Sequence, residues 1–213
     1  MPRKKYIRND RFPYHVTARC INKDWFRIPI EEVWAITSDY LFFINYTYKV
    51  KIHSFVLMNN HFHLVISAPN MNLSEAMNYF MREVSRQITR ISGRINSTFG
   101  SRFHRSLIPR HHHYMNVYKY VYRNPIEAGL ARCVEQYKFS TLHGLLGQSK
   151  ITVPVAADTV IFCDEVDRNL QWLNTKPPKF LWNKMKIGLR KSVFELSVDQ
   201  RSRKPCTLEV DLL

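Results

Sequence analysis

The chain has 213 residues, 45% of them hydrophobic, and its 32 Lys and Arg against 17 Asp and Glu give a formal charge of +15. This length and apolar content suffice for one substantial domain, and no uninterrupted apolar stretch is long enough for a transmembrane helix. The excess of positive charge favours a phosphate-rich partner, nucleic acid above all, over a membrane surface.

The cysteines and the N-terminus narrow the class of protein further. Four cysteines lie far apart and form no C-x-x-C pair, so neither a disulfide framework nor a thiolate zinc site is expected. The basic residues after Met1 are followed by Tyr6 and further polar residues rather than by an apolar run. A signal peptide is therefore not expected, and we predict a cytoplasmic protein.

The first predicted elements are a strand over 14–20 and a helix over about 30–49. The strand is rich in β-branched and aromatic residues, and the helix carries apolar residues at helical spacing after Pro29. His15 lies on the strand, where it either packs in the sheet or approaches a metal ion. The packed interpretation is favoured, because a lone strand histidine is more often structural.

Two further strands, 51–57 and 61–67, are predicted to form a hairpin around adjacent asparagines. The second strand begins with His61, Phe62 and His63. Because residues two apart lie on the same face of a strand, the two imidazoles project side by side. They are either a clamp for a divalent metal ion or two half-exposed strand histidines, and the residues alone leave both interpretations open.

Basic residues follow on the next helix and strand. The helix, predicted over about 72–91, packs one face and repeats arginine every four residues on the other, at Arg82, Arg86 and Arg90. The strand, predicted over 102–108, carries Arg102 and Arg105. These arginines are either solvent-facing charges or contacts to a DNA backbone. The run His111 to His113 is interpreted as a surface segment.

A third helix is predicted over about 113–123, and its tyrosines form two sets. Tyr114, Tyr118 and Tyr122 repeat every four residues, whereas Tyr120 lies about 200° from Tyr118, on the opposite face with Asn124. Pro125 disfavours helical geometry at Asn124, so we predict Asn124 to be the N-cap of a new helix that runs to about residue 135.

The composition changes near residue 150, which predicts a domain over 1–148 and a basic extension over 149–213. Basic segments at 184–191 and 201–204 would wrap nucleic acid or merely keep the protein soluble. The basic residues predicted to contact DNA in the first segment are Lys184, Lys186, Arg190 and Lys191.

Three blocks together resemble a known family. They are Tyr14-His15-Val16-Thr17-x-Arg19, Met58-Asn59-Asn60-His61-Phe62-His63-Leu64, and the run from Tyr120-Val121-Tyr122-Arg123-Asn124-Pro125 to Leu130. In order and spacing they resemble the HUH single-strand transposases with one catalytic tyrosine, which are IS200-like. Within this group, the chain most resembles the REP-associated tyrosine transposases of bacteria. These proteins are linked to repetitive extragenic palindromes. The resemblance spans about residues 10 to 145, and it implies a bacterial protein associated with the nucleoid.

The resemblance implies an α+β fold, a ferredoxin-like (RRM-like) antiparallel sheet with helices packed on it. It also implies that His61 and His63 bind a divalent metal ion, Mg²⁺ or Mn²⁺, and that Tyr120 is the nucleophile. Asn124 matches the third metal ligand of some relatives. The implied reaction nicks and rejoins hairpin-associated single-stranded DNA, such as REP-like palindromes, through a 5′-phosphotyrosine intermediate, in a monomer or a homodimer.

Two other functions are compatible with these residues. An RRM-like sheet also serves non-catalytic nucleic-acid-binding modules, which stack bases on strand aromatics. A metal phosphoesterase would use water in place of Tyr120. Only the transposase would form a covalent adduct with DNA that disappears when Tyr120 is replaced by phenylalanine.

Overall fold

An antiparallel sheet is the centre of the structure, a computed structural model that describes residues 7–163, 165–196, 206–209 and 211–213. Within these residues the sheet has four strands in the order β2-β3-β1-β4. The strands are β1 (Tyr14–Arg19), β2 (Lys51–Leu57), β3 (His61–Ser67) and β4 (His104–Leu107). With α1 (Ile30–Tyr48) after β1 and α2 (Leu73–Ser92) after β3, this is the βαββαβ arrangement of a ferredoxin-like fold. The predicted α+β class and antiparallel sheet are confirmed.

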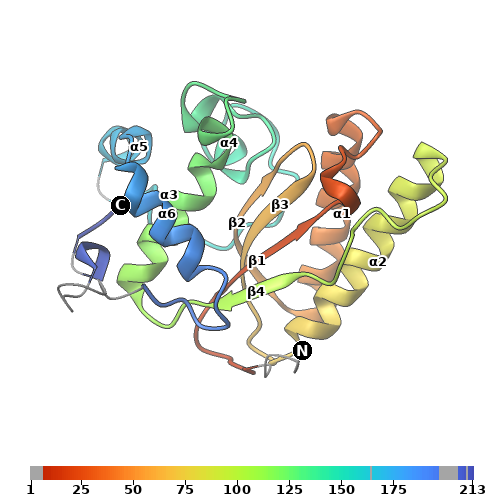
Figure 1. Ribbon diagram of the computed structural model, residues 1–213, viewed down its shortest axis with the longest axis horizontal. Helices are drawn as coiled ribbons and strands as arrows, with labels where there is room; N and C mark the ends of the chain where they lie inside the picture. Colours follow the sequence, from red (N-terminus) through yellow and green to blue (C-terminus); the bar gives the residue numbers. More distant parts are fainter. Residues whose placement is uncertain (1–6, 164, 197–205, 210) are drawn as a thin grey trace.

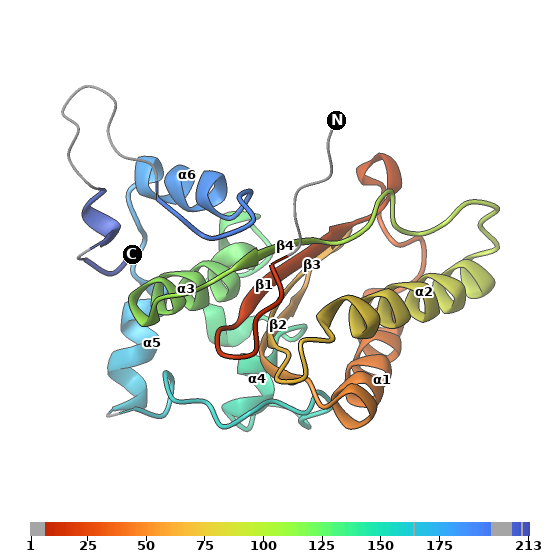
Figure 2. The ribbon, with the colours of Figure 1, turned by 90° about the horizontal axis from the view of Figure 1, so that it is seen from below.

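Helices α1 and α2 cover one face of the sheet, as Figure 2 shows. Two local signals set the ends of these helices. Glu31 and Glu32 lie in the first turn of α1, where the partial positive charge of the helix N-terminus stabilises carboxylates. Gly93 ends α2 in the left-handed conformation, with φ 64°. Alternate strand residues, among them Val16, Phe62 and Leu64, are buried in this layer. The residues between them, His15 and the two β3 histidines, therefore face the opposite side.

The opposite face carries α3 (His111–Glu127) and the C-terminal half of the chain (Figure 1). The shorter elements are η1 (Ile21–Lys23), η2 (Val134–Gln136), α4 (Thr141–Leu145), α5 (Val166–Asn174), α6 (Lys179–Gly188) and η3 (Thr207–Glu209). A second group of buried residues joins α3 to elements after residue 148, including Leu173 of α5 and Trp182 of α6. The boundary at residue 148 stays a prediction, and the basic residues 201–204 lie outside the described residues.

Helix α3 is longer than predicted at both ends. It begins at His111, and because successive helical residues turn by about 100°, the three histidines diverge. His111 is exposed, whereas His113 is buried, with its Nε2 3.0 Å from a carboxylate oxygen of Glu209. The prediction of a surface segment is therefore wrong for His113.

The predicted helix from Asn124 to about residue 135 is also wrong. Helix α3 continues past Asn124 to Glu127, and turns then lead to η2. Proline removes one hydrogen bond and crowds the preceding turn. The residues around it still close the last turn, by bonds from Ala128 N to Asn124 O at 3.0 Å and from Leu130 N to Pro125 O at 2.8 Å. Asn124 is therefore a helical residue one turn after Tyr120 and not an N-cap.

In the part of the chain that the structure describes, no helix combines the length and apolar character needed to cross a membrane.

Candidate active site

His61 and His63 stand next to each other on β3, on the sheet face that α3 covers. Their ring centroids are 5.0 Å apart, and the neighbouring strand β1 pairs Arg19 with His61 and Thr17 with His63. His63 is buried and His61 is half-buried. The side-by-side geometry expected from strand alternation is thus present, at the end of the sheet next to the β2–β3 turn.

A hydrogen bond engages Nδ1 of each histidine. His63 Nδ1 is 2.9 Å from Nε2 of His15, and His61 Nδ1 is 2.7 Å from Oδ1 of Asn60. An imidazole held at Nδ1 presents Nε2 to a metal ion in a defined orientation. His15 is buried and stacked on His63, with centroids 5.2 Å apart. His15 is therefore packed in the sheet, which is the interpretation that the sequence favoured. It also contacts His63, a predicted metal ligand.

All three imidazoles are neutral at pH 7. Burial, with a smaller contribution from His104, lowers the pKa of His15 to about 3. Burial and the charge of Arg19 lower the pKa of His61 to about 4. Burial, helped by His15, His61 and Arg19, lowers the pKa of His63 well below its ordinary value. The neutral imidazole is the form that binds metal ions, so this pair fits a divalent cation.

A divalent cation bound by His61 and His63 would need a further ligand. Among the described residues, no three His, Cys, Asp or Glu side chains are grouped so that they would hold a metal ion. The nearby amide is Asn124, which lines the same cavity as the two histidines. Its Nδ2 donates a hydrogen bond of 2.7 Å to the carbonyl of Tyr120, which leaves Oδ1 as the oxygen suited to a hard cation.

Tyr120 faces the histidines across the space between α3 and the sheet. Its ring centroid is 5.7 Å from that of His63 and 6.2 Å from that of His15, in both cases edge to face. The other tyrosines face away, since Tyr118 donates to Asp158 and Tyr122 bonds Thr141. The predicted separation of Tyr120 from its neighbours is confirmed, and a single chain brings Tyr120 and the histidines together.

The phenol of Tyr120 is protonated at neutral pH. Burial raises its pKa to about 12, opposed by a hydrogen bond with the Asn124 side chain and by the charges of Arg19 and Arg190. Trp182 of α6 lies against the ring, with centroids 4.6 Å apart. A buried phenol of this kind loses its proton more readily when positive charge lies nearby.

These residues line a cavity of about 580 Å³ with basic walls. Three of the predicted DNA contacts line it, namely Arg102, Lys186 and Arg190. Arg82 and Arg86 lie elsewhere, in a groove beside α2 that Arg102 also borders. The four remaining residues border neither space: Arg90, Arg105, Lys184 and Lys191. Of these, Arg105 lies 5.4 Å from the Phe103 ring and Lys191 pairs with Glu195 at 3.7 Å.

Three residues of the site were not predicted from the sequence to belong to it. Arg19 lies two residues after Thr17 and four after His15, so strand alternation alone indicates its face. His104 of β4 pairs with Thr17 across the sheet. Trp182 has no local signal, because only the packing of α6 on α3 brings it to Tyr120.

Comparison with protein families gives the class of this protein. Residues 11–124 match the family model described as Transposase IS200 like, and this match covers more than half of the chain. The chain therefore belongs to the IS200-like transposase family, as its resemblance predicted. No curated protein sequence gives a significant match.

Comparison with solved structures identifies a protein with a similar fold. The chain is similar to a REP-associated tyrosine transposase bound to a REP hairpin, with a TM-score of 0.56 over 76% of this chain and 94% of that chain. The two sequences are 21% identical, so the likeness establishes a shared fold.

Proposed function

We propose that this transposase is a metal-dependent endonuclease and ligase for single-stranded DNA, with Tyr120 as its nucleophile. The observation that carries the proposal is the contact between Tyr120 and His63 inside a basic cavity of one chain. A phenol, two neutral imidazoles and several cations in one space suit attack on a phosphodiester. A module that only binds nucleic acid has no need of this arrangement.

In this proposal Nε2 of His61, Nε2 of His63 and Oδ1 of Asn124 would hold the cation. Bound there, Mg²⁺ or Mn²⁺ would provide Lewis-acid chemistry for the scissile phosphate. Two imidazoles favour Mn²⁺ over Mg²⁺, because nitrogen ligands suit the softer ion.

The protein groups supply the remaining chemistry. The phenol oxygen of Tyr120 bonds to phosphorus while the bond to the 3′-oxygen breaks, which leaves a 5′-phosphotyrosine. The phenol proton passes to solvent, and the leaving 3′-oxygen takes a proton from water. Arg19 and Arg190 favour the phenolate, and Trp182 restrains the ring. Because the covalent bond retains the phosphodiester energy, a 3′-hydroxyl reverses the step without ATP.

The DNA partner in this proposal is a strand with a hairpin, as in REP-like palindromes. The solved relative is bound to a REP hairpin. In this chain, Arg102, Lys186 and Arg190 around the cavity provide cationic contacts for a phosphate backbone. The nick then lies next to the hairpin, where the backbone is single-stranded and accessible.

The test is to incubate the protein with end-labelled hairpin DNA and Mn²⁺ and to separate the products on a denaturing gel. We expect a DNA–protein adduct that disappears in Tyr120→Phe. Tyr114→Phe is the matched control, because Tyr114 lies on the same helix and its ring contacts Tyr118 and His53 rather than His61 or His63. Cleavage without an adduct, or an adduct that persists in Tyr120→Phe, would contradict the proposal.

A further inference from the structure

The solvent side of α1 carries aromatic residues that the proposed reaction does not use. Phe42 and Tyr46 are 57% and 70% exposed, and Phe43 beside them is also exposed. Contiguous exposed aromatic side chains of this kind are typical of an interaction surface. At 100° per residue, the exposed residues within about 100° of arc on this side form what we call the α1 face: Glu32, Ala35, Asp39, Phe42, Phe43 and Tyr46.

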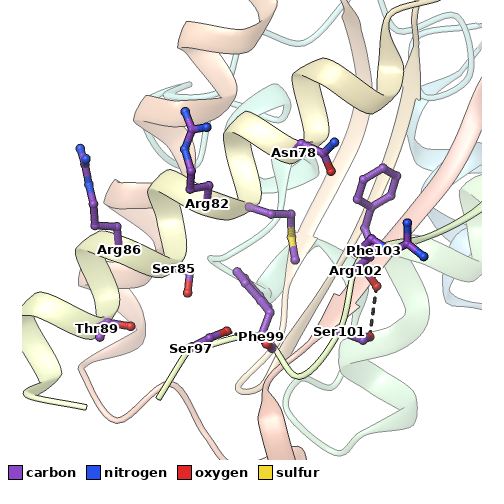
Figure 3. Close-up of a pocket in the computed structure, with 11 residues that line it drawn as sticks. Asn78, Arg82, Ser85, Arg86, Thr89, Ser97, Phe99, Ser101, Arg102 and Phe103 are labelled. Atoms are coloured by element: carbon purple, nitrogen blue, oxygen red, sulfur yellow. Dashed lines mark hydrogen bonds between the residues drawn. The ribbon is translucent and has the colours of Figure 1, made fainter. Parts of the chain in front are cut away.

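The α1 face is separate from both spaces that contain predicted DNA contacts. Helix α1 covers the side of the sheet opposite α3 and the candidate active site (Figure 2). The described residues that line the active-site cavity, and those that line the groove beside α2 shown in Figure 3, include none from the α1 face. A partner that covers this face therefore leaves the candidate active site open.

The charge of α1 is opposite to that of the whole chain. The helix contains Glu31, Glu32 and Asp39 and no Lys or Arg, whereas the chain has a formal charge of +15. Carboxylates repel a phosphate backbone, so the α1 face does not suit nucleic acid. Glu31 and Glu32 lie in the first turn of the helix, and Lys49 and Lys51 follow its last turn. The helix is therefore acidic at one end and followed by basic residues at the other.

The aromatic part of the α1 face is held in place within the chain. Phe43 is stacked on Tyr79 of α2, with ring centroids 4.7 Å apart and planes at 18°. Tyr79 also contacts Tyr48, with centroids 6.1 Å apart. The Lys49 ammonium lies 4.6 Å from the centre of the Tyr46 ring. Because these side chains are already packed, little conformational entropy is lost when a partner covers them.

A surface with opposite charges at its two ends is complementary to a second copy of itself. In an antiparallel pair of α1 helices, Glu32 can lie opposite Lys49 of the second copy, which places Ala35 opposite Tyr46 of that copy. A two-fold axis repeats both pairs. Opposite charges then meet at both ends, the small Ala35 side chain leaves room for the Tyr46 ring, and the two helix dipoles run in opposite directions.

We propose that two copies of this protein associate through their α1 faces, with the helices antiparallel. The contact extends over about 20 Å, the length of helix from Glu32 to Tyr46 at 1.5 Å per residue. A contact this small, with the two Asp39 carboxylates near the axis, gives a weak dimer with a Kd of about 10 µM. The two candidate active sites then lie on opposite sides of the dimer, so that one dimer can bind two DNA segments.

The test is sedimentation velocity of the full-length, DNA-free protein between about 1 and 100 µM, a range that spans weak dimers. Phe42→Ser with Tyr46→Ser should raise the Kd about tenfold or more, because the exposed rings leave the interface. Phe180→Ser is the matched control, because Phe180 is 60% exposed on α6, outside the α1 face. Circular dichroism checks that each variant is folded.

Charge reversal tests the pairing of Glu32 with Lys49. Glu32→Lys alone, or Lys49→Glu alone, places like charges opposite each other twice in its own dimer, so the Kd should rise about tenfold. In an equimolar mixture, one copy of each variant restores two pairs of opposite charge. Mixed dimers, detected with one variant fluorescently labelled, should therefore form with about wild-type affinity.

Three results would overturn the inference: the wild-type protein stays monomeric up to about 100 µM, Phe180→Ser weakens the dimer as much as the two serines in the α1 face, or the mixed charge variants associate no better than either variant alone. A wild-type dimer that is lost with the two serines and restored by mixing the charge variants would support it. None of these measurements depends on DNA cleavage, so the proposed reaction is tested separately.

Discussion

The imidazoles of His15 and His63 are joined by a hydrogen bond of 2.9 Å between Nε2 of the first and Nδ1 of the second. The two residues lie 48 positions apart and on neighbouring strands, and both side chains are buried. In the proposed site His63 would bind the cation through Nε2, so its proton would lie on Nδ1 and be donated to His15. His15 would then orient the ligand without being a ligand itself.

Replacing His15 should therefore weaken metal binding. We expect His15→Phe to raise the Kd for Mn²⁺ about 10- to 100-fold, the usual effect of removing a hydrogen-bond partner of a metal ligand. His15→Gln should restore much of the affinity, because its amide oxygen still accepts a hydrogen bond. Isothermal titration with Mn²⁺ measures both variants, and unchanged affinity in His15→Phe would refute this role. His53→Gln is the control, since His53 bonds Ser67 on the sheet.

Asn124→Ala should reduce both Mn²⁺ affinity and adduct formation, each by about tenfold or more, because it removes the proposed oxygen ligand. The rejected N-cap interpretation instead predicted a loss of stability with no effect on the reaction. Thermal melting, Mn²⁺ titration and the adduct gel on the same variant separate the two. A lower melting temperature with normal adduct formation would exclude Asn124 as a ligand.

The buried neutral histidines should make stability depend on pH. The pKa of His15 is about 3 in the folded protein and about 6.5 when unfolded, so the unfolded chain binds more protons between these values. Its contribution is complete above pH 6.5 and is lost as the pH falls toward 3. Between pH 7 and pH 5 this single group lowers the free energy of unfolding by about 2 kcal/mol.

Urea denaturation of wild type and His15→Gln at pH 7 and pH 5 measures this contribution. The glutamine variant does not titrate, so its stability should fall less between the two pH values than that of the wild type. Equal losses in both proteins would show that His15 does not account for the pH dependence.

Arg19→Gln should slow cleavage by about two- to tenfold near pH 8. The positive charge of Arg19 lowers the pKa of Tyr120, which burial raises to about 12, so its removal disfavours the phenolate. The rising part of the pH–rate profile should move to higher pH. Single-turnover rates between pH 7 and pH 10 check this. A uniform loss of rate without a shift would mean that Arg19 acts on DNA binding instead.

Local periodicity in the sequence was enough to predict the sheet and half of the candidate site. Period two along β3 puts His61 and His63 on one face, and 3.6 residues per turn separates Tyr120 from the stripe of Tyr118. These relationships depend only on backbone geometry within one element. The roles of the three residues in catalysis, and the DNA contacts, stay predictions.

Contacts between distant segments were decided only by the tertiary structure. The bond between His15 and His63 requires β1 to pair with β3, and the contact between Trp182 and Tyr120 requires α6 to pack on α3. The path of α3 through Pro125 was also misjudged, because packing outweighs the local cost of proline in a last turn. Local patterns determined which faces the side chains occupy, whereas the packing of elements far apart in the chain determined which side chains meet.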